Sequence, residues 1–451
     1  MEENKMGTMP VGKLLYSMAL PMIISMMVQA LYNIVDSMYV SRISEAALTA
    51  VSLVFPIQNL MIAIATGTGV GINALLSRAL GAKQFDKADK AAQHGVFLGI
   101  VSSLVIMVLM FFLASPFMSV QTDDPVIHDG GVVYLRICCC VSIGLFVQIT
   151  MERLLASTGR TNLTMISQLA GAIINIIMDP VMIFGYGPFP EMGIAGAAAA
   201  TVLGQCIGAL IGIWLNHHYN HEISLTRIPF RIDPGFIREV YAIAVPSIVM
   251  VSIGSLMTFG MNMILMQQLN SPTGAAVFGV YFKLNSIIFM PVFGLNNAMV
   301  PIIAYNYGAR HKARIKQTIR DSVIFGEAVM LIGFGFFQLM PDRLLAIFNA
   351  SEEMTAIGTH ALRVISLSFL FAGICVVLSS VMQAMGKAFY SMITSIARQL
   401  VILLPSAWIL AKLSGLDAVW WSFDIAEIAS LLLMTAFYRR TKKQLIDPLP
   451  E

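Results

Sequence analysis

Charged residues are scarce in this chain. Asp, Glu, Lys and Arg make up only 12% of its 451 residues, whereas soluble domains carry about 25%. Hydrophobic residues make up 57%. This composition excludes an ordinary soluble domain and indicates a protein that crosses the lipid bilayer several times. The net charge of +3 is small, and we expect no nucleic-acid partner.

Cysteines are few, and catalytic motifs are missing. Three of the five cysteines are consecutive, Cys138, Cys139 and Cys140; neighbours on a helix diverge, so they predict neither a metal site nor a disulfide framework. No nucleophile–base pair, metal motif or nucleotide-binding loop is present, so we expect neither an enzyme nor a cofactor. The first apolar run, 14–40, is too long for the core of a cleavable signal peptide.

Apolar segments long enough to span a bilayer, about 20 residues each, recur along the chain. We expect about twelve transmembrane helices, at 14–40, 46–79, 91–114, 130–156, 161–185, 194–215, 236–268, 273–306, 318–340, 355–384, 389–412 and 418–438. Lysines and arginines gather in alternate loops, at 83–90, 227–231 and 310–316, and in the tail at 439–443. Positive charge marks the cytoplasmic side, so both termini should be cytoplasmic.

The sequence repeats internally. Gly81 and Gly159 recur in similar surroundings as Gly308 and Gly386, each 227 positions later. We therefore expect two six-helix lobes related by a pseudo-two-fold axis. They would comprise residues 1–216 and 234–451, the second with a basic cytoplasmic tail, joined by a cytoplasmic linker at 217–233. Repeats of this kind build transporters whose binding site lies near the bilayer midplane.

One expected helix carries a carboxylate in the middle of an apolar run. Asn175 and Asp179 are four residues apart, so they share a helix face, which Gln168 extends backwards. An ionisable residue near mid-bilayer costs about 2.5–3.5 kcal/mol on insertion scales and usually faces an interior cavity. Pro180 follows directly and predicts a bend in the helix.

Other expected helices carry similar polar stripes. They hold Gln29, Tyr32, Asn33 and Asp36 on the first helix, Gln148 and Glu152 on the fourth, and Thr201 and Gln205 on the sixth. Scattered structural hydrogen bonds are the alternative interpretation. We favour an aqueous cavity over that alternative, because four helices of one lobe carry such stripes and three of the stripes hold a carboxylate.

Such a cavity would handle cations. Low-dielectric surroundings favour the neutral form of a carboxylic acid, so Asp36 or Asp179 can exchange a proton near neutral pH. Alternatively, Asp36, Asn175 and Asp179 can bind Na⁺ through their oxygens, with Thr201 beside them. The 31 methionines and 26 phenylalanines would accept apolar cations of various shapes.

The chain resembles the multidrug and toxic compound extrusion (MATE) transporters over nearly its full length. The resemblance is carried by the aspartate of the first helix and by the segments RALGAKQFDKA, IINIIMDPVMIFG and GIAGAAAATVLGQ. They are most similar to the bacterial branch of DNA-damage-inducible protein F and the staphylococcal multidrug exporters. The resemblance implies a monomeric, V-shaped, all-α protein of the bacterial cytoplasmic membrane. It implies export of cationic, hydrophobic drugs by alternating access, driven by H⁺ or Na⁺. The implied cation-coupling residues are Asp36, Asn175, Asp179 and Thr201; Gln29, Gln148, Glu152 and Gln168 would line the same chamber.

The second half departs from another branch of that family. The norfloxacin exporters place a Glu on helix seven and an Asp on helix ten, whereas 247–266 and 365–386 hold no carboxylate. We therefore expect no ion site in the second lobe. Arg398, Asp424 and Glu427 are interpreted as a buried structural ion pair, because one basic residue neutralises one acid.

The alternative function is a lipid-linked precursor flippase of the same superfamily. Such a protein should line its cavity with Arg and Lys to bind pyrophosphate. The stripes here are acidic, which favours the exporter.

Overall fold

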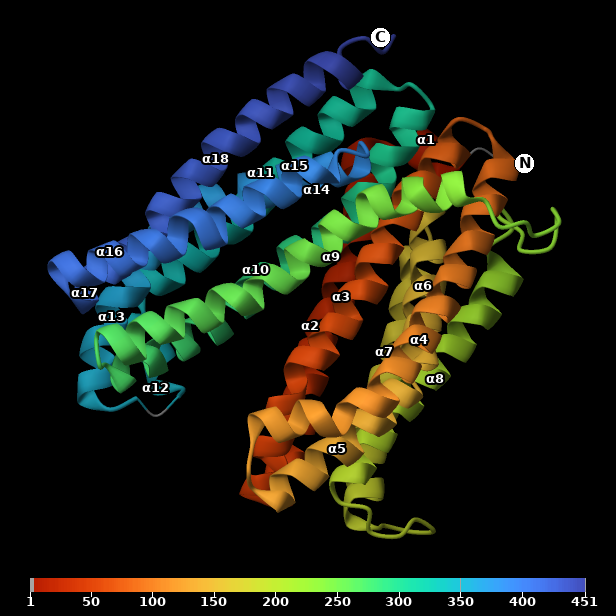
Figure 1. Ribbon diagram of the computed structural model, residues 1–451. Coiled ribbons are helices and arrows are strands. Elements are labelled where there is room, and N and C mark those ends of the chain that lie inside the picture. The colour runs from red at the N-terminus through yellow and green to blue at the C-terminus, as the bar shows by residue number, and fades with distance from the viewer. Residues whose placement is uncertain (1–3, 349, 451) are drawn as a thin grey trace.

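The computed structural model describes residues 4–348 and 350–450, and within these ranges it contains helices and no strand (Figure 1). Eleven of the described helices are long and apolar enough to cross a membrane, and one bent helix pair supplies a twelfth span. The prediction of an all-α protein with about twelve transmembrane helices is therefore confirmed.

The first half contributes six spans after the short helix α1 (Lys5–Thr8). They are α2 (Val11–Ser41), α3 (Glu45–Gly81), α4 (Phe85–Gln121), the pair α5 (Pro125–Cys140) and α6 (Ile143–Ser157), α7 (Thr161–Phe184), and α8 (Ile194–Tyr219).

The second half contributes six more spans, several with internal irregularities. The first three are α9 (Pro234–Met263), which ends in the π-helical turn Ile264–Gln268, α10 (Pro272–Gly308) and α11 (Lys312–Leu339). The next two are each made of two helices: α13 (Glu352–Ile365) continues through the 3₁₀ turn Ser366–Ser368 into α14 (Phe369–Ala384), and α15 (Ala388–Ile396) continues through the π-helical turn Ala397–Leu403 into α16 (Leu404–Ser414). The last is α18 (Trp421–Thr441), which ends in the π-helical turn Lys442–Ile446. The short helices α12 (Pro341–Ala346) and α17 (Leu416–Val419) lie in connections.

The spans form two groups, which we call the N-lobe (α2–α8) and the C-lobe (α9–α18). Figure 1 shows that the lobes converge at the end that carries both termini, here called the terminal end, and diverge toward the opposite end. The lobes meet where α2 packs on α10 and α3 packs on α9 and α10. The V shape predicted from the family resemblance is present.

α7 continues through Pro180 to Phe184, because a proline removes one backbone hydrogen bond and the last turn still forms; the bend expected at Pro180 stays a prediction. The chain also bends by 44° between α5 and α6, where Val141 and Ser142 separate the two helices. The predicted single span 130–156 is thus a broken one.

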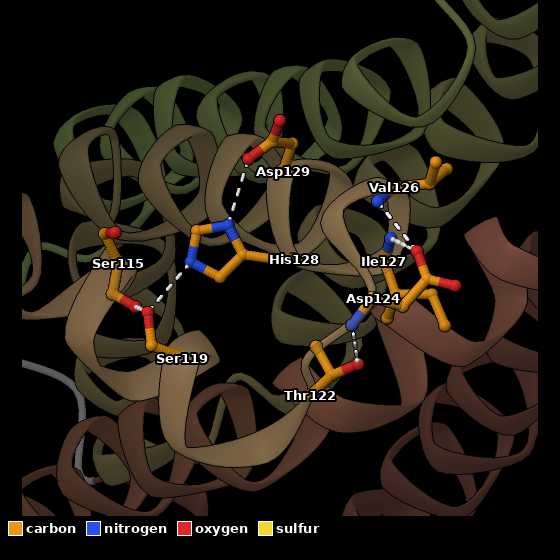
Figure 2. Close-up of polar contacts among 8 residues, drawn as sticks. All are labelled: Ser115, Ser119, Thr122, Asp124, Val126, Ile127, His128 and Asp129. Carbon is orange, nitrogen blue, oxygen red and sulfur yellow. Dashed lines mark hydrogen bonds and ion pairs between the residues drawn. The ribbon is translucent and has the colours of Figure 1, made fainter.

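The turn between α4 and α5 is fixed by side-chain hydrogen bonds (Figure 2). The Asp124 carboxylate caps α5 by accepting from the backbone N–H of Val126 at 2.8 Å. The His128 ring contacts the Ser119 hydroxyl at 3.1 Å and the Asp129 carboxylate at 2.9 Å. A side chain that satisfies free N–H groups at a helix start stabilises that start by about 1 kcal/mol. These contacts set where α5 begins.

The lobes approach most closely at two glycines that the repeat relates to each other. A Cβ on Gly81 would lie 1.9 Å from the carbonyl oxygen of Tyr305, and one on Gly308 would lie 2.0 Å from that of Arg78. Only residues without a side chain permit this backbone contact. The repeated glycines therefore form the crossing of α3 and α10.

The N-terminal segment lies against both lobes at the terminal end. The Arg314 guanidinium donates to the carbonyl oxygens of Met6 and Met9 at 2.9 and 2.7 Å. The Asn4 amide donates to the carbonyl oxygen of Thr158 at 3.0 Å, and the Met6 side chain is fully buried. Residues 4–9 thus connect α11 of the C-lobe to the N-lobe.

The connection between the lobes, residues 220–233, is docked onto α4. The buried Asp89 carboxylate accepts from the Ser224 N–H at 2.7 Å and lies 3.3 Å from the Arg227 guanidinium. Lys90 forms an ion pair with Asp233, and this contact lowers the pKa of the Asp233 carboxyl. The connection is held in place by charge at both ends; the domain boundaries at 216 and 234 stay a prediction.

Candidate functional site

Two carboxyl groups meet in the N-lobe. Asp36 of α2 and Asp179 of α7 lie with their side chains within interaction distance of each other. An ionised carboxylate is an acceptor only, so two carboxyl groups can share a hydrogen bond only when one of them carries a proton. A proton, or another cation, at the pair would therefore relieve the repulsion between the two acids.

Asn175 and Thr201 complete this group. The Asn175 amide nitrogen lies 3.2 Å from Asp179 Oδ1 and 3.3 Å from Thr201 Oγ1. Asp179 is fully buried and Asn175 is 3% exposed. The structure thus brings together all four residues predicted for cation coupling; their role stays a prediction.

Three oxygens of the group lack a donor. Asp36 Oδ1, Asn175 Oδ1 and Asp179 Oδ2 are buried and have no hydrogen-bond partner in the part of the chain that the structure describes. Buried oxygens are normally satisfied. Oxygens left without a donor can bind a proton or a hard cation such as Na⁺, which prefers oxygen ligands. The donor set therefore fits either predicted ion.

Glu152 of α6 is, by contrast, well satisfied. Its carboxylate accepts from Gln148 Nε2 at 3.0 Å, Ser167 Oγ at 3.3 Å and Gln168 Nε2 at 2.7 Å. Glu152 as a whole is 4% exposed. Three donors offset part of the hydration that a buried carboxylate loses. Both glutamines were predicted for the chamber, whereas Ser167 was missed because a lone serine in an apolar helix gives no sequence signal.

Tyr32 connects these two acidic groups. Its hydroxyl is hydrogen-bonded to Gln29, and the charges of Asp36 and Glu152 both act on it. The polar stripe of α2 therefore faces the stripes of α6 and α7, as the helix spacing predicted.

Exposure decreases from α2 into the lobe. Gln29 and Asn33 are exposed, Asp36 is half-buried, and Asp179 is fully buried. Gln205 of α8 is half-buried and takes part in none of the hydrogen bonds described above.

No basic residue neutralises the carboxyl pair. Among residues 4–348 and 350–450, neither an arginine nor a lysine forms an ion pair with Asp36 or Asp179. The nearby Arg153 instead donates to Asn297 of α10 at 2.9 Å, across the lobe interface. Asp179 therefore forms no structural ion pair with a basic residue in the described ranges.

The predicted ion pair of the C-lobe is only partly formed. Arg398 Nη1 lies 3.1 Å from Glu427 Oε2. Asp424 lies one turn away on α18, and both of its carboxylate oxygens are buried with no partner at full hydrogen-bond geometry among the described residues. Asp424 thus stands outside the pair to which the sequence interpretation assigned it.

Comparison with known proteins gives full-length matches. The chain is 25% identical to the multidrug export protein MepA of Staphylococcus haemolyticus, over 96% of this chain and 95% of that protein. It is 26% identical to a protein of Shewanella oneidensis named FAD transporter, over 93% and 92% of the two chains.

Solved structures match the fold equally well. A transporter described as an outward-facing multidrug resistance MATE family protein of the MOP superfamily aligns with a TM-score of 0.91 at 23% identity, over 99% of both chains. A MOP superfamily transporter from Pyrococcus furiosus, described as having a binding pocket of reversed polarity, gives the same values. At 23% sequence identity, these two structures show that the fold is shared, but they do not show a shared substrate or mechanism.

The MatE family model matches residues 21–181 and 246–409, one stretch in each lobe. These two stretches cover most of the chain and correspond to its internal repeat. The chain therefore belongs to the MatE family of multidrug and toxic compound extrusion transporters.

Proposed function

We propose that this transporter exports cationic, apolar compounds from the bacterial cytoplasm in exchange for H⁺ or Na⁺. The observation that carries the proposal is the Asp36–Asp179 carboxyl pair, which has two buried, donor-free oxygens, a third beside them on Asn175, and no basic partner in the described structure. The name of the staphylococcal relative, a multidrug export protein, supports the same function.

In this proposal the terminal end faces the cytoplasm, because the loops rich in Lys and Arg lie at that end. The lobes converge there (Figure 1), so the structure corresponds to an outward-facing state. An ion from outside reaches the pair from the end at which the lobes diverge, and binding neutralises charge that would otherwise hold a cationic drug. The two ligands compete through shared carboxyl groups, which couples them by about 1–3 kcal/mol.

The charge of the chamber favours cationic over anionic substrates. Its three carboxyl groups, on Asp36, Glu152 and Asp179, outnumber Arg153, the cation whose charge acts on Glu152, whereas FAD and lipid-linked precursors carry a negatively charged pyrophosphate. An acidic chamber repels such groups. For this reason we favour drug export over the flippase alternative and over the substrate named for the Shewanella relative.

Ethidium efflux from everted membrane vesicles tests the proposal, with a pH gradient and a sodium gradient imposed separately. We expect one of the two gradients to drive efflux. Asp36→Asn and Asp179→Asn should each abolish it, because an amide oxygen neither takes up a proton nor balances the charge of Na⁺. The control is Glu45→Gln, which removes an exposed carboxylate from the same lobe.

Protein amounts in the membrane are measured for every variant, so that loss of efflux is not confused with loss of protein. Full efflux in either Asp variant would overturn the assignment of the ion site. Efflux that neither gradient drives would overturn the exchange mechanism.

A further inference from the structure

A second group of buried carboxyl groups lies in the C-lobe. It consists of Glu327 on α11, Asp424 and Glu427 on α18, and Arg398 in the π-helical turn between α15 and α16. We call these four residues the C-lobe acid cluster. None of them lies on the two stretches, 247–266 and 365–386, whose lack of carboxylates predicted that this lobe has no ion site.

Glu427 is the centre of the cluster. One of its oxygens accepts from Arg398 at 3.1 Å, and the Cys375 thiol lies beside the carboxylate as a weak donor. The charge of Glu427 acts on both Glu327 and Asp424. The two outer acids therefore lie near the same central carboxylate.

The cluster has more acids than bases. Arg398 is paired with Glu427, whereas the charged group that acts on Asp424 and on Glu327 within residues 4–348 and 350–450 is the Glu427 carboxylate and not a cation. The other ionisable groups that face the cluster are the neutral Tyr281 of α10 and Cys375 of α14. Ionising all three acids would leave two uncompensated negative charges inside a lipid-embedded lobe. Burying such a charge costs several kcal/mol, so the groups are neutralised instead.

Asp424 and Glu327 are short of hydrogen-bond donors. Asp424 is 8% exposed; the donors beside its carboxylate are the backbone N–H groups of Ser368 and of Asp424 itself, and within residues 4–348 and 350–450 neither oxygen has a partner at full hydrogen-bond geometry. Beside Glu327 the donor is the backbone N–H of Ile374, and Oε2 of Glu327 likewise has no partner at that geometry. It lies against Gly373, where a Cβ would come within 2.7 Å of it. A glycine thus makes room for this carboxyl group between α11 and α14.

The position of Arg398 depends on an irregular helix. Pro405 has no N–H, so the carbonyl of Val401 lacks its usual partner. The chain forms a π-helical turn over Ala397–Leu403, which changes the direction of the side chains in that turn. π-helical turns occur frequently at functional sites.

We propose that the C-lobe acid cluster is a proton-binding site, at which Asp424 and Glu327 take up and release protons independently of the Asp36–Asp179 pair. A proton fits this cluster better than a metal ion, because the Arg398 guanidinium would repel a metal cation beside Glu427. A neutral carboxylic acid, in contrast, has no net charge for the guanidinium to repel. This inference goes beyond the proposed exchange mechanism and does not depend on it.

Infrared difference spectroscopy of the purified protein in lipid nanodiscs tests the proposal, since a protonated carboxylic acid has a carbonyl stretch that a carboxylate lacks. The measurement uses the triple variant Asp36→Asn, Glu152→Gln, Asp179→Asn, which has no acids in the N-lobe chamber. We expect a protonated-acid band that decreases as the pH rises. Adding Asp424→Asn or Glu327→Gln should each remove part of that band.

The amide replacements have nearly the size of the acids and are uncharged, as the protonated acids are, and size-exclusion chromatography verifies that each variant is intact. If the triple variant does not fold, the spectra of the wild-type chain and of its single variants replace it. The control Asp417→Asn removes an exposed carboxylate of the same lobe and should leave the band unchanged. No pH-dependent band, or a band that persists unchanged without Asp424 and Glu327, overturns the proposal. No drug or gradient is used, so failure of the exchange proposal would not affect the result.

Discussion

At the scale of single residues, the acids of the N-lobe chamber fall into two kinds. Glu152 accepts three side-chain hydrogen bonds, whereas Asp36 and Asp179 keep oxygens without a donor. A satisfied carboxylate gains little from binding an additional ion, while donor-free buried oxygens gain much. This difference is why we assign ion exchange to the aspartate pair and not to Glu152.

Asn175→Ala should change proton binding without removing the carboxyl groups. The amide of Asn175 donates to Asp179 at 3.2 Å, and hydrogen bonds to charged groups contribute about 1.5–3 kcal/mol. Because loss of this donor destabilises the ionised carboxylate, we expect the H⁺ concentration for half-maximal ethidium efflux to fall about tenfold, since 1.4 kcal/mol corresponds to a factor of about ten. The measurement is efflux at graded concentrations of the driving ion. Asn162→Ala, an exposed amide on the same helix, is the control; an unchanged half-maximal concentration in Asn175→Ala would contradict the prediction.

At the scale of helices, the crossing of α3 and α10 determines how closely the lobes meet. Gly81 ends α3 and Gly308 ends α10. Because the two glycines occupy equivalent places in the repeat, the contact is made by the same structural feature from each lobe. The closure of the terminal end therefore rests on a backbone contact that no other residue type permits.

Gly81→Ala and Gly308→Ala should each separate the lobes at the terminal end. The added methyl groups would lie 1.9 and 2.0 Å from backbone oxygens, distances that require the helices to move apart. Spin labels on the terminal ends of α4 and α11 should report longer distances, and efflux should fall.

Gly279→Ala is the matched control for this prediction. It lies on α10 as well, and a Cβ there would meet no atom within 4 Å. Distances that stay the same in all three variants would show that the glycine crossing does not hold the lobes together.

At the scale of the whole molecule, residues 4–9 connect elements that are far apart in sequence. This segment bonds to Thr158 near the end of α6 and to Arg314 on α11. A segment that contacts both lobes at one end stabilises the state in which that end is closed.

Arg314→Ala should therefore increase the population of molecules that are open at the terminal end. The substitution removes two hydrogen bonds to the Met6 and Met9 carbonyls, each contributing about 1.5–3 kcal/mol when the donor is charged. The same pair of spin labels measures the two populations. Arg320→Ala changes an exposed arginine on the same helix and should leave them as they are. An unchanged distribution in Arg314→Ala would mean that the N-terminal segment does not contribute to closure.

The sequence by itself determined the membrane spans, the two related halves and the grouping of Asp36, Asn175, Asp179 and Thr201. The spans follow from local hydrophobicity, which each segment carries alone. The halves follow from glycines repeated at a constant interval. The site followed because residues four apart share a helix face, together with the resemblance to a known family.

Only the tertiary structure decided the remaining features. It placed Ser167 on Glu152, separated Asp424 from Arg398, and brought Glu327 beside the cluster on α18. It also put a bend between α5 and α6, and left α7 continuous through Pro180. The physical reason is that contacts between helices depend on how each one is rotated and how deep it lies relative to its neighbours. The pattern along a single helix specifies a face, but it does not specify which residue of another helix that face will meet.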